Sequence, residues 1–207
     1  MSRFVITIGR YCGSGGSSVG RLVAEKLGVN FYDKALLRMA SEESGISEEL
    51  FAQADEKLKS SLVYKVSRQI YKGELIPPES EDFTSNRNLF NYQAKVLRQL
   101  AEKESFVVVG RCSDFVLKDI PGIERVFICA DNETCVRREA DRMSVSYREA
   151  DNRCAKLNKY RAEYHRYYTG NEWTDPRNYD LMINTSKVSY EEAADLIVEH
   201  MKVRGLV

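Results

Sequence analysis

A glycine-rich loop lies between an apolar segment and an amphipathic helical pattern near the start of the chain. Phe4–Ile8 is apolar, Gly13–Ser18 contains three glycines and three serines, and the helical face that follows carries Val19, Leu22, Val23 and Leu27. Loop amides and the positive end of a helix attract anions, and glycine lets the backbone approach them closely. The segment predicts a strand, a phosphate-binding loop and a helix, which is the opening unit of an α/β fold.

The loop lacks the lysine of the phosphate-binding pattern G-x-x-x-x-G-K-[ST], because Gly16 stands at that position. A lysine charge about 4 Å from a phosphate contributes roughly 4 kcal/mol at an effective dielectric of 20, or about a thousandfold in rate. A phosphate site that lacks this lysine needs another cation for an equal effect, and Arg10, Arg21 and Arg138 are candidates.

Two other interpretations of the loop remain open. Clusters of glycine and serine also form ordinary tight turns. Asp33 follows the loop by about 20 residues, where a dinucleotide-binding fingerprint has its ribose-binding acid. Ser18 in place of a third glycine, and the four residues between Ile8 and Gly13, argue against that fingerprint.

Composition excludes several classes of protein. The 207 residues include 31 Lys and Arg against 31 Asp and Glu, so a generally basic nucleic-acid or membrane-surface binder is not indicated. No apolar segment reaches the roughly 18 residues of a membrane span. The five cysteines form no C-x-x-C pair and no signal-peptide pattern is present, so we expect a cytoplasmic protein.

Apolar strand-like segments alternate with helical patterns along the whole chain. The predicted strands are Phe4–Ile8, Val29–Asp33, Phe106–Val109, Val126–Cys129 and Leu181–Asn184. A helical insertion at 34–88 ends in a mobile loop, and Ser189 with Glu192 forms a capping box for a last helix. This pattern predicts one α/β domain over 1–207, with a mostly parallel sheet covered by helices on both faces.

Polar residues follow several of these strands. Ligands of parallel sheets bind outside the carboxyl ends of the strands, where the loop, Asp33, Arg111 and Asp131 are all expected. Arg111 directly follows an apolar strand, and a buried guanidinium requires an acid or an anionic ligand. Its planar fork suits a phosphate, while a pair with Asp114 or Asp33 is the alternative.

A basic stretch occupies residues 153–168, with five Lys or Arg against one Glu. Arg137, Arg138 and Arg142 lie just before it. Such a stretch is typical of a lid that closes cations over transferring phosphates. A solvated helix face with its tyrosines in the core is the plainer alternative, and stacking on single-stranded RNA is a weaker one.

Taken together, these segments resemble the cytidylate kinase-like family, a divergent branch of the P-loop nucleoside-monophosphate kinases. The similarity covers nearly the whole chain and rests on Ile6–Gly16, Phe31–Asp33, Val108–Arg111, Lys159–Arg161, Tyr167–Thr169 and Tyr179–Ser186. The resemblance implies a three-layer α/β/α P-loop fold and transfer of the ATP γ-phosphoryl group to CMP or dCMP, with Mg²⁺ bridging the phosphates.

The resemblance also assigns roles to residues of this sequence. The ATP-binding residues would be Gly13, Ser14, Gly15, Gly16, Ser17 and Ser18, with Ser18 contacting the metal. The acceptor-binding residues would be Asp33, Arg38 and Arg111, and the catalytic ones Asp33, Arg111, Arg138, Lys159 and Arg161. The insertion 34–88 would bind the acceptor, and 132–175 would form the lid.

Two alternative functions remain. A nucleotide-binding regulator would keep the loop and the lid but lack turnover because of Gly16, and a P-loop kinase could act on a metabolite that is not a nucleotide. In either case we expect a small-molecule ligand and neither a nucleic acid nor a membrane partner. The sequence predicts no oligomeric state.

Overall fold

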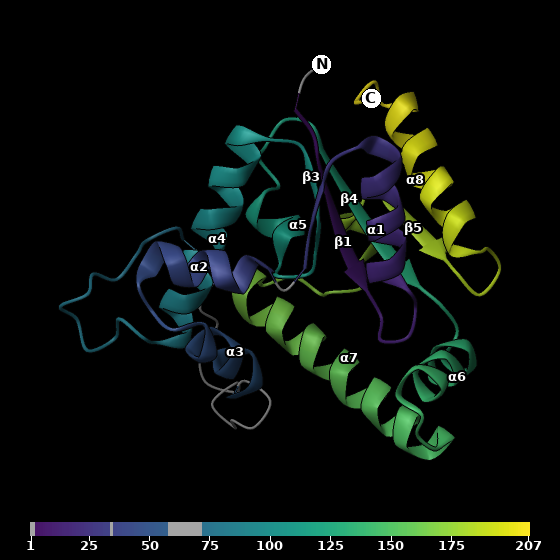
Figure 1. The fold of residues 1–207 in the computed structure, drawn as a ribbon, viewed down its shortest axis with the longest axis horizontal. Helices are drawn as coiled ribbons and strands as arrows, with labels where there is room; N and C mark the ends of the chain where they lie inside the picture. The colour runs from purple at the N-terminus through teal and green to yellow at the C-terminus, as the bar shows by residue number, and fades with distance from the viewer. Residues whose placement is uncertain (1–2, 34, 58–71) are drawn as a thin grey trace.

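A five-stranded parallel sheet in the order β2-β3-β1-β4-β5 forms the centre of the computed structural model, which describes residues 3–33, 35–57 and 72–207 (Figure 1). The strands are β1 (Val5–Arg10), β2 (Asn30–Tyr32), β3 (Phe106–Val109), β4 (Ile123–Cys129) and β5 (Leu181–Asn184). All four neighbouring pairs are parallel. Each strand therefore needs a crossover to the next, as the alternating sequence pattern indicates.

Helices cover both faces of the sheet, which gives the predicted α/β/α layers (Figure 1). They are α1 (Gly16–Leu27), α2 (Ala35–Ser44), α3 (Glu48–Lys57), α4 (Asn86–Lys103), α5 (Ser113–Val116), α6 (Asn132–Met143), α7 (Tyr147–Thr169) and α8 (Tyr190–Val203). Because side chains alternate along a strand, Ile6 and Ile8 pack towards α1 and α8, whereas Val5 and Val108 pack towards α4.

Several predicted boundaries are confirmed. Gly28 ends α1 with a left-handed backbone, at φ 65°. Ser189 and Glu192 form the expected reciprocal capping box of α8, and β5 has its predicted bounds. β1 continues two residues beyond the predicted Ile8, to Arg10. This extension matters because it places Arg10 at the carboxyl end of the central strand.

The predicted insertion 34–88 begins with α2 and α3 and ends at the start of α4. Residues 58–71 of this insertion lie outside the described residues. The four-residue helix α5 has no counterpart in the sequence pattern, because it is too short to show a period. Of the helices that the structure describes, none combines the length and apolar character needed to cross a bilayer.

The long helix α7 crosses the carboxyl end of the sheet (Figure 1). A capping box formed by Ser146 and Glu149 starts it. Its last turn is fixed to α4, because the ring of Tyr168 stacks on Phe90 with centroids 3.9 Å apart and its hydroxyl donates to the Asn86 carbonyl at 3.1 Å. This anchor determines where the basic residues of α7 lie relative to the strands.

Replacing Tyr168 should therefore weaken the whole fold. Tyr168→Ala is expected to lower the free energy of unfolding by about 3–5 kcal/mol, because the ring is 1% exposed, whereas Tyr168→Phe should cost only about 1 kcal/mol for the lost hydrogen bond. Urea denaturation measures both. Tyr147→Ala, at an exposed tyrosine on the same helix, is the control, and an equal loss in both alanine variants would contradict the anchor.

Candidate active site

The glycine-rich loop connects β1 to α1 in a form that only glycine permits at two positions. Gly13 and Gly15 have left-handed backbones, at φ 76° and 84°. A Cβ on Gly13 would lie 2.7 Å from the carbonyl carbon of Cys135, and one on Gly15 would lie 2.7 Å from the hydroxyl oxygen of Tyr190. The loop is thus enclosed by α6 and α8, and its conformation is fixed.

The first turn of α1 presents unsatisfied amides. The Gly15 N-cap has no side-chain hydrogen bond, and among the described residues no acceptor binds the amides of Gly16, Ser17 or Ser18. Ser14 has a different role, because its buried hydroxyl donates to the Ile128 carbonyl at 2.9 Å and ties the loop to β4. Three amides are therefore available to an anion.

Ser17 and Asp33 lie together beside these amides. The Ser17 hydroxyl donates to Oδ2 of Asp33 at 3.3 Å, and Ser18 is exposed on the next position of α1. Hydroxyl and carboxylate oxygens are the ligands that Mg²⁺ takes in proteins, so this pair fits the metal that the family resemblance implies. The metal contact assigned to Ser18 stays a prediction.

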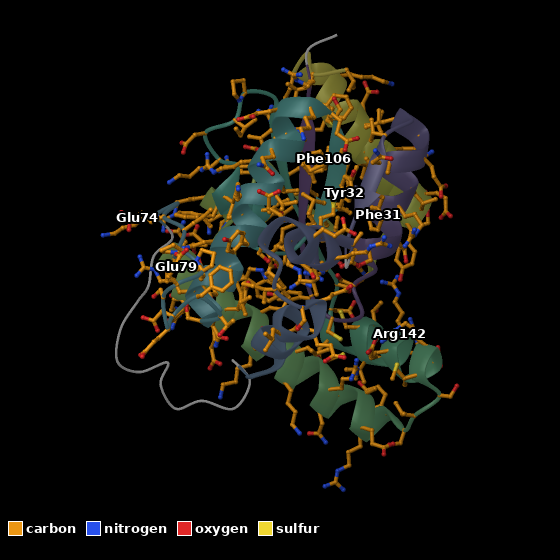
Figure 2. All side chains as sticks on the ribbon, turned by 60° about the vertical axis from the view of Figure 1, so that its left-hand side comes forward. Phe31, Tyr32, Glu74, Glu79, Phe106 and Arg142 are labelled. Atoms are coloured by element: carbon orange, nitrogen blue, oxygen red, sulfur yellow. The ribbon has the colours of Figure 1, made fainter. Side chains whose placement is uncertain are left out.

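A cavity opens over the loop and is lined by five arginines. The lining arginines are Arg10, Arg138, Arg142, Arg153 and Arg161, and Gly13 and Gly15–Ser18 line the loop side. Glu74 and Glu79 of the acidic turn before α4 lie on the opposite side of the molecule from Arg142 (Figure 2). Cations thus line this cavity even though the net charge of the chain is zero.

Three of these arginines bind residues of α6 or Thr185 after β5. Arg138 donates to the Thr185 hydroxyl at 3.0 Å and carbonyl at 2.9 Å. Arg142 and Arg153 both bind the buried carboxylate of Glu139, at 2.6 and 2.8 Å. The hydrogen bond from Arg142 is the largest cause that lowers the pKa of Glu139, so this acid stays ionised. Glu139 therefore offsets part of the positive charge at that end of the cavity.

Arg161 and Arg10 form the other end of the cavity. Arg161 donates from Nη1 to the Arg10 carbonyl at 3.1 Å. Burial is the main cause that lowers the pKa of both guanidinium groups, and the charge of Arg161 contributes to lowering the pKa of Arg10 to about 9. Two partly buried cations therefore lie next to the loop, and the charge of Asp33 acts to raise the pKa of each.

A second cavity lies beyond them, at the end of β3. It is lined by Gly9, Arg10, Val109, Gly110, Arg111, Cys112, Asp114, Tyr160, Arg161, Tyr164, His165 and Trp173. Gly110, Arg111 and Cys112 are all left-handed, at φ 75°, 62° and 49°. Such a backbone costs a non-glycine residue about 1–2 kcal/mol, and strain of this kind concentrates at functional sites. The strained turn places Arg111 in the cavity wall.

The second cavity also contains a buried pair, His165 and Asp114, that is not predicted from the sequence. His165 Nε2 lies 2.8 Å from Oδ2 of Asp114, and Thr169 and the Asn171 carbonyl contact its other nitrogen. Asp114 was expected only as a possible partner of Arg111. The available signal was helical spacing, since His165 is four residues beyond Arg161 and shares its face.

Two predicted residues lie away from both cavities. The side chain of Lys159 is 78% exposed and 4.0 Å from Glu163, and that of Arg38 is 75% exposed and bonded to Glu42 at 3.0 Å. Lys159 faces away because two positions along a helix turn a side chain by about 200° relative to Arg161. The structure therefore brings together the loop, Asp33, Arg111, Arg138 and Arg161, and leaves Lys159 and Arg38 outside.

The chain matches the sequence model of a known protein family. That model describes the cytidylate kinase-like family, and it matches residues 5–187. The chain belongs to the cytidylate kinase-like family. The match includes the glycine loop, the second cavity, all of the loop cavity except Tyr190 and the strained turn at Arg111, so the predicted resemblance is confirmed. Family membership supports phosphoryl transfer as the class of reaction.

Solved structures agree with this assignment. An uncharacterized protein from Eubacterium ventriosum is 30% identical, with a TM-score of 0.71 over 97% of this chain and 99% of that one. Shikimate kinase from Bacteroides thetaiotaomicron has a TM-score of 0.53 and 15% identity over 99% of both chains. At that identity the likeness shows the P-loop kinase fold alone.

One curated protein shares a shorter stretch. Uronate isomerase from Corynebacterium glutamicum is 33% identical over 100 residues, which are 48% of this chain and 19% of the isomerase. The aligned stretch spans about a fifth of that relative. The family match covers far more of the chain.

The strained turn predicts a difference in stability between two variants at position 111. Glycine there should be more stable than alanine by about 1–2 kcal/mol, because only glycine adopts φ 62° without strain. Differential scanning calorimetry of Arg111→Gly and Arg111→Ala should show this difference as about 2–4 °C in Tm per kcal/mol. Equal Tm values would contradict a strained backbone at Arg111.

The buried His165 pair predicts a pH dependence of stability. Burial lowers the pKa of His165, but the hydrogen bond and charge of Asp114 outweigh it, and the net pKa is raised. Between the ordinary value of about 6.5 and the raised one, the folded protein holds a proton that the unfolded chain releases, so stability should fall as pH rises. Urea denaturation across this range should show a smaller fall in His165→Gln and Asp114→Asn. An unchanged fall in both variants would contradict the pair.

Proposed function

We propose that this protein is an ATP-dependent kinase that transfers the γ-phosphoryl group to a nucleoside monophosphate, with CMP and dCMP as the first candidates. One observation carries the proposal. Among the described residues, the loop cavity and the Arg111 cavity share two lining residues, Arg10 and Arg161. A donor in the first and an acceptor in the second would meet at these two cations.

The loop cavity supports a nucleoside triphosphate as donor. Three amides of α1 and the arginines of the same cavity are suited to phosphate oxygens. Ser17 and Asp33 would hold Mg²⁺. When bound, this ion would neutralise charge on the phosphates. Phosphoryl transfer needs little covalent chemistry from the protein, so fixed positive charge and exact positioning supply most of the catalysis.

The second cavity supports an anionic acceptor with a flat ring. Arg111 would bind the acceptor phosphate through its planar fork. Tyr160, Tyr164 and Trp173 supply aromatic surface, and Asp114 with His165 supplies polar atoms. A nucleoside monophosphate has both a phosphate and a base, which matches this combination. Asp33, beside Ser17, is the carboxylate that we propose to orient the attacking oxygen.

A metabolite acceptor is the second candidate. Arg38, which the family resemblance assigns to acceptor binding, is exposed and bonded to Glu42, and α2 and α3 contribute no residue to the second cavity in the described part of the chain. The solved shikimate kinase, of the same fold, is named for a substrate that is not a nucleotide. An acceptor bound without the insertion would fit this geometry.

The single tryptophan makes acceptor binding directly measurable. Trp173 lines the second cavity, and the chain has no other tryptophan. Addition of CMP or dCMP should therefore change the intrinsic fluorescence, and ADP should form only when ATP, Mg²⁺ and acceptor are all present. Arg111→Ala should raise KM for the acceptor about tenfold to a hundredfold, because it removes a charged hydrogen-bonding group.

Two arginine variants and a panel of possible acceptors distinguish a nucleotide acceptor from a metabolite acceptor. Arg3→Ala, at an exposed arginine before the opposite end of β1, should leave KM unchanged. Arg38→Ala should raise KM only if the insertion binds the acceptor. Shikimate and gluconate are assayed beside CMP, dCMP, UMP, AMP and GMP. If no nucleotide is phosphorylated and Arg111→Ala alters no nucleotide affinity, the nucleotide proposal is wrong.

A further inference from the structure

Glycine and a cation have exchanged positions in the phosphate-binding loop of this chain. With Gly15 at the second glycine of G-x-x-x-x-G-K-[ST], Arg10 stands at the first glycine and Gly16 at the lysine. The loop has thus lost a positive charge at its seventh position and gained one at its first. Both positions lie where the chain leaves β1 and enters α1.

The structure shows that these two changes depend on each other. A Cβ on Gly16 would lie 2.8 Å from Cγ of Arg10 and closer still to its Cβ, so the arginine stem excludes any side chain at Gly16. The next neighbour, Ile128 Cβ, is 3.6 Å away, which is an ordinary contact. Gly16 also has no positive φ. Arg10 alone therefore prevents a lysine at this position.

The far end of Arg10 lies beside Gly110. A Cβ on Gly110 would lie 3.3 Å from Cζ of Arg10 and closer still to Nη1. The side chain consequently runs from the loop to the strained turn after β3. This path ends between the two cavities, both of which Arg10 lines.

The guanidinium of Arg10 makes no ion pair with a carboxylate in the described part of the chain. Burial and the nearby charge of Arg161 lower its pKa, and the charge of Asp33, which lies beyond ion-pairing distance, offsets this only in part. Glu139, by contrast, is bonded to Arg142 and Arg153. A confined cation without a carboxylate partner is stabilised when an anion binds beside it.

We infer that Arg10 is the catalytic cation that contacts the transferred phosphoryl group, in place of the loop lysine. The inference rests on the proposed kinase function. A lysine would approach the phosphates from α1, whereas Arg10 approaches from the central strand, on the side that faces the acceptor. Its forked guanidinium can bind a phosphoryl oxygen through two N–H groups, which an ammonium cannot do.

The test is an exchange of the two residues. Arg10→Gly should lower kcat by about a hundredfold to a thousandfold, the usual effect of losing one charged contact to a transition state. The double variant Arg10→Gly with Gly16→Lys should recover activity to within about tenfold of the wild type, because removing the arginine stem leaves room for lysine. Arg3→Ala should match the wild type, which would show that the loss of activity is specific to Arg10 and does not follow from removal of any arginine.

A binding measurement separates catalysis from folding. The wild type should bind ATP more tightly than ADP in the presence of Mg²⁺, and Arg10→Gly should reduce that preference at least about tenfold while binding of ADP changes little. Arg10→Lys keeps the charge and should retain part of the preference. A structural role for Arg10 would instead weaken ATP and ADP equally.

The outcomes distinguish this inference from the proposed function. If Arg10→Gly keeps wild-type kcat and the wild-type ATP preference, Arg10 is not the catalytic cation even though the kinase proposal stands. If Arg10→Gly fails to fold, the double variant decides, since a folded double variant without activity overturns the inference. If the wild type binds no ATP, both the proposed kinase function and the inference about Arg10 are wrong. If it binds ATP but transfers no phosphoryl group, the kinase function alone is wrong, and the comparison of ATP and ADP binding still tests whether Arg10 contacts the terminal phosphate.

Discussion

The packing of the Arg10 stem against the first turn of α1 is the constraint on which the rest of the site depends. The stem requires the absence of a side chain at Gly16, and the guanidinium at the flexible end of the side chain lies beside Gly110. After β3 the chain turns through three successive left-handed residues that end at Cys112. The path of one side chain thus leads from the glycine-rich loop to the turn that carries Arg111.

The positive charge of the site is unevenly compensated. Glu139 is bonded to two arginines at the α6 end, and the carbonyl and hydroxyl of Thr185 hold Arg138. Arg10 and Arg161 instead lie where the cavities meet, and the guanidinium of Arg161 donates to the backbone carbonyl of Arg10. In the described part of the chain neither guanidinium forms an ion pair with a carboxylate, so this boundary is suited to an anion. A chain of zero net charge can therefore carry a strongly local phosphate site.

The sequence predicts the strands, the loop and most helices because their apolar spacing is regular. It does not predict which members of the basic stretch enter the site, because a count of basic residues does not show which of them share a face of the helix. Arg161 and Lys159 both belong to that stretch, yet only Arg161 shares the face of the buried Tyr164 and Tyr168. The spacing of those tyrosines was the signal that would have distinguished them. The left-handed backbone at Arg111 has no such signal, because tertiary contacts impose it on a residue that ordinarily avoids it.

Arg10, at the end of β1, reaches both cavities, which a lysine in the loop would not do. A lysine on α1 would face the loop cavity alone, whereas Arg10 lines the loop cavity and the second cavity together with Arg161. If both cavities bind anions, as the proposed function requires, both anions would interact with the same two cations, and the free energy of binding at one cavity would depend on occupancy of the other. Such a dependence is reciprocal by thermodynamic necessity. Exchanging glycine and cation within one loop therefore moves the positive charge from one cavity to the boundary between two.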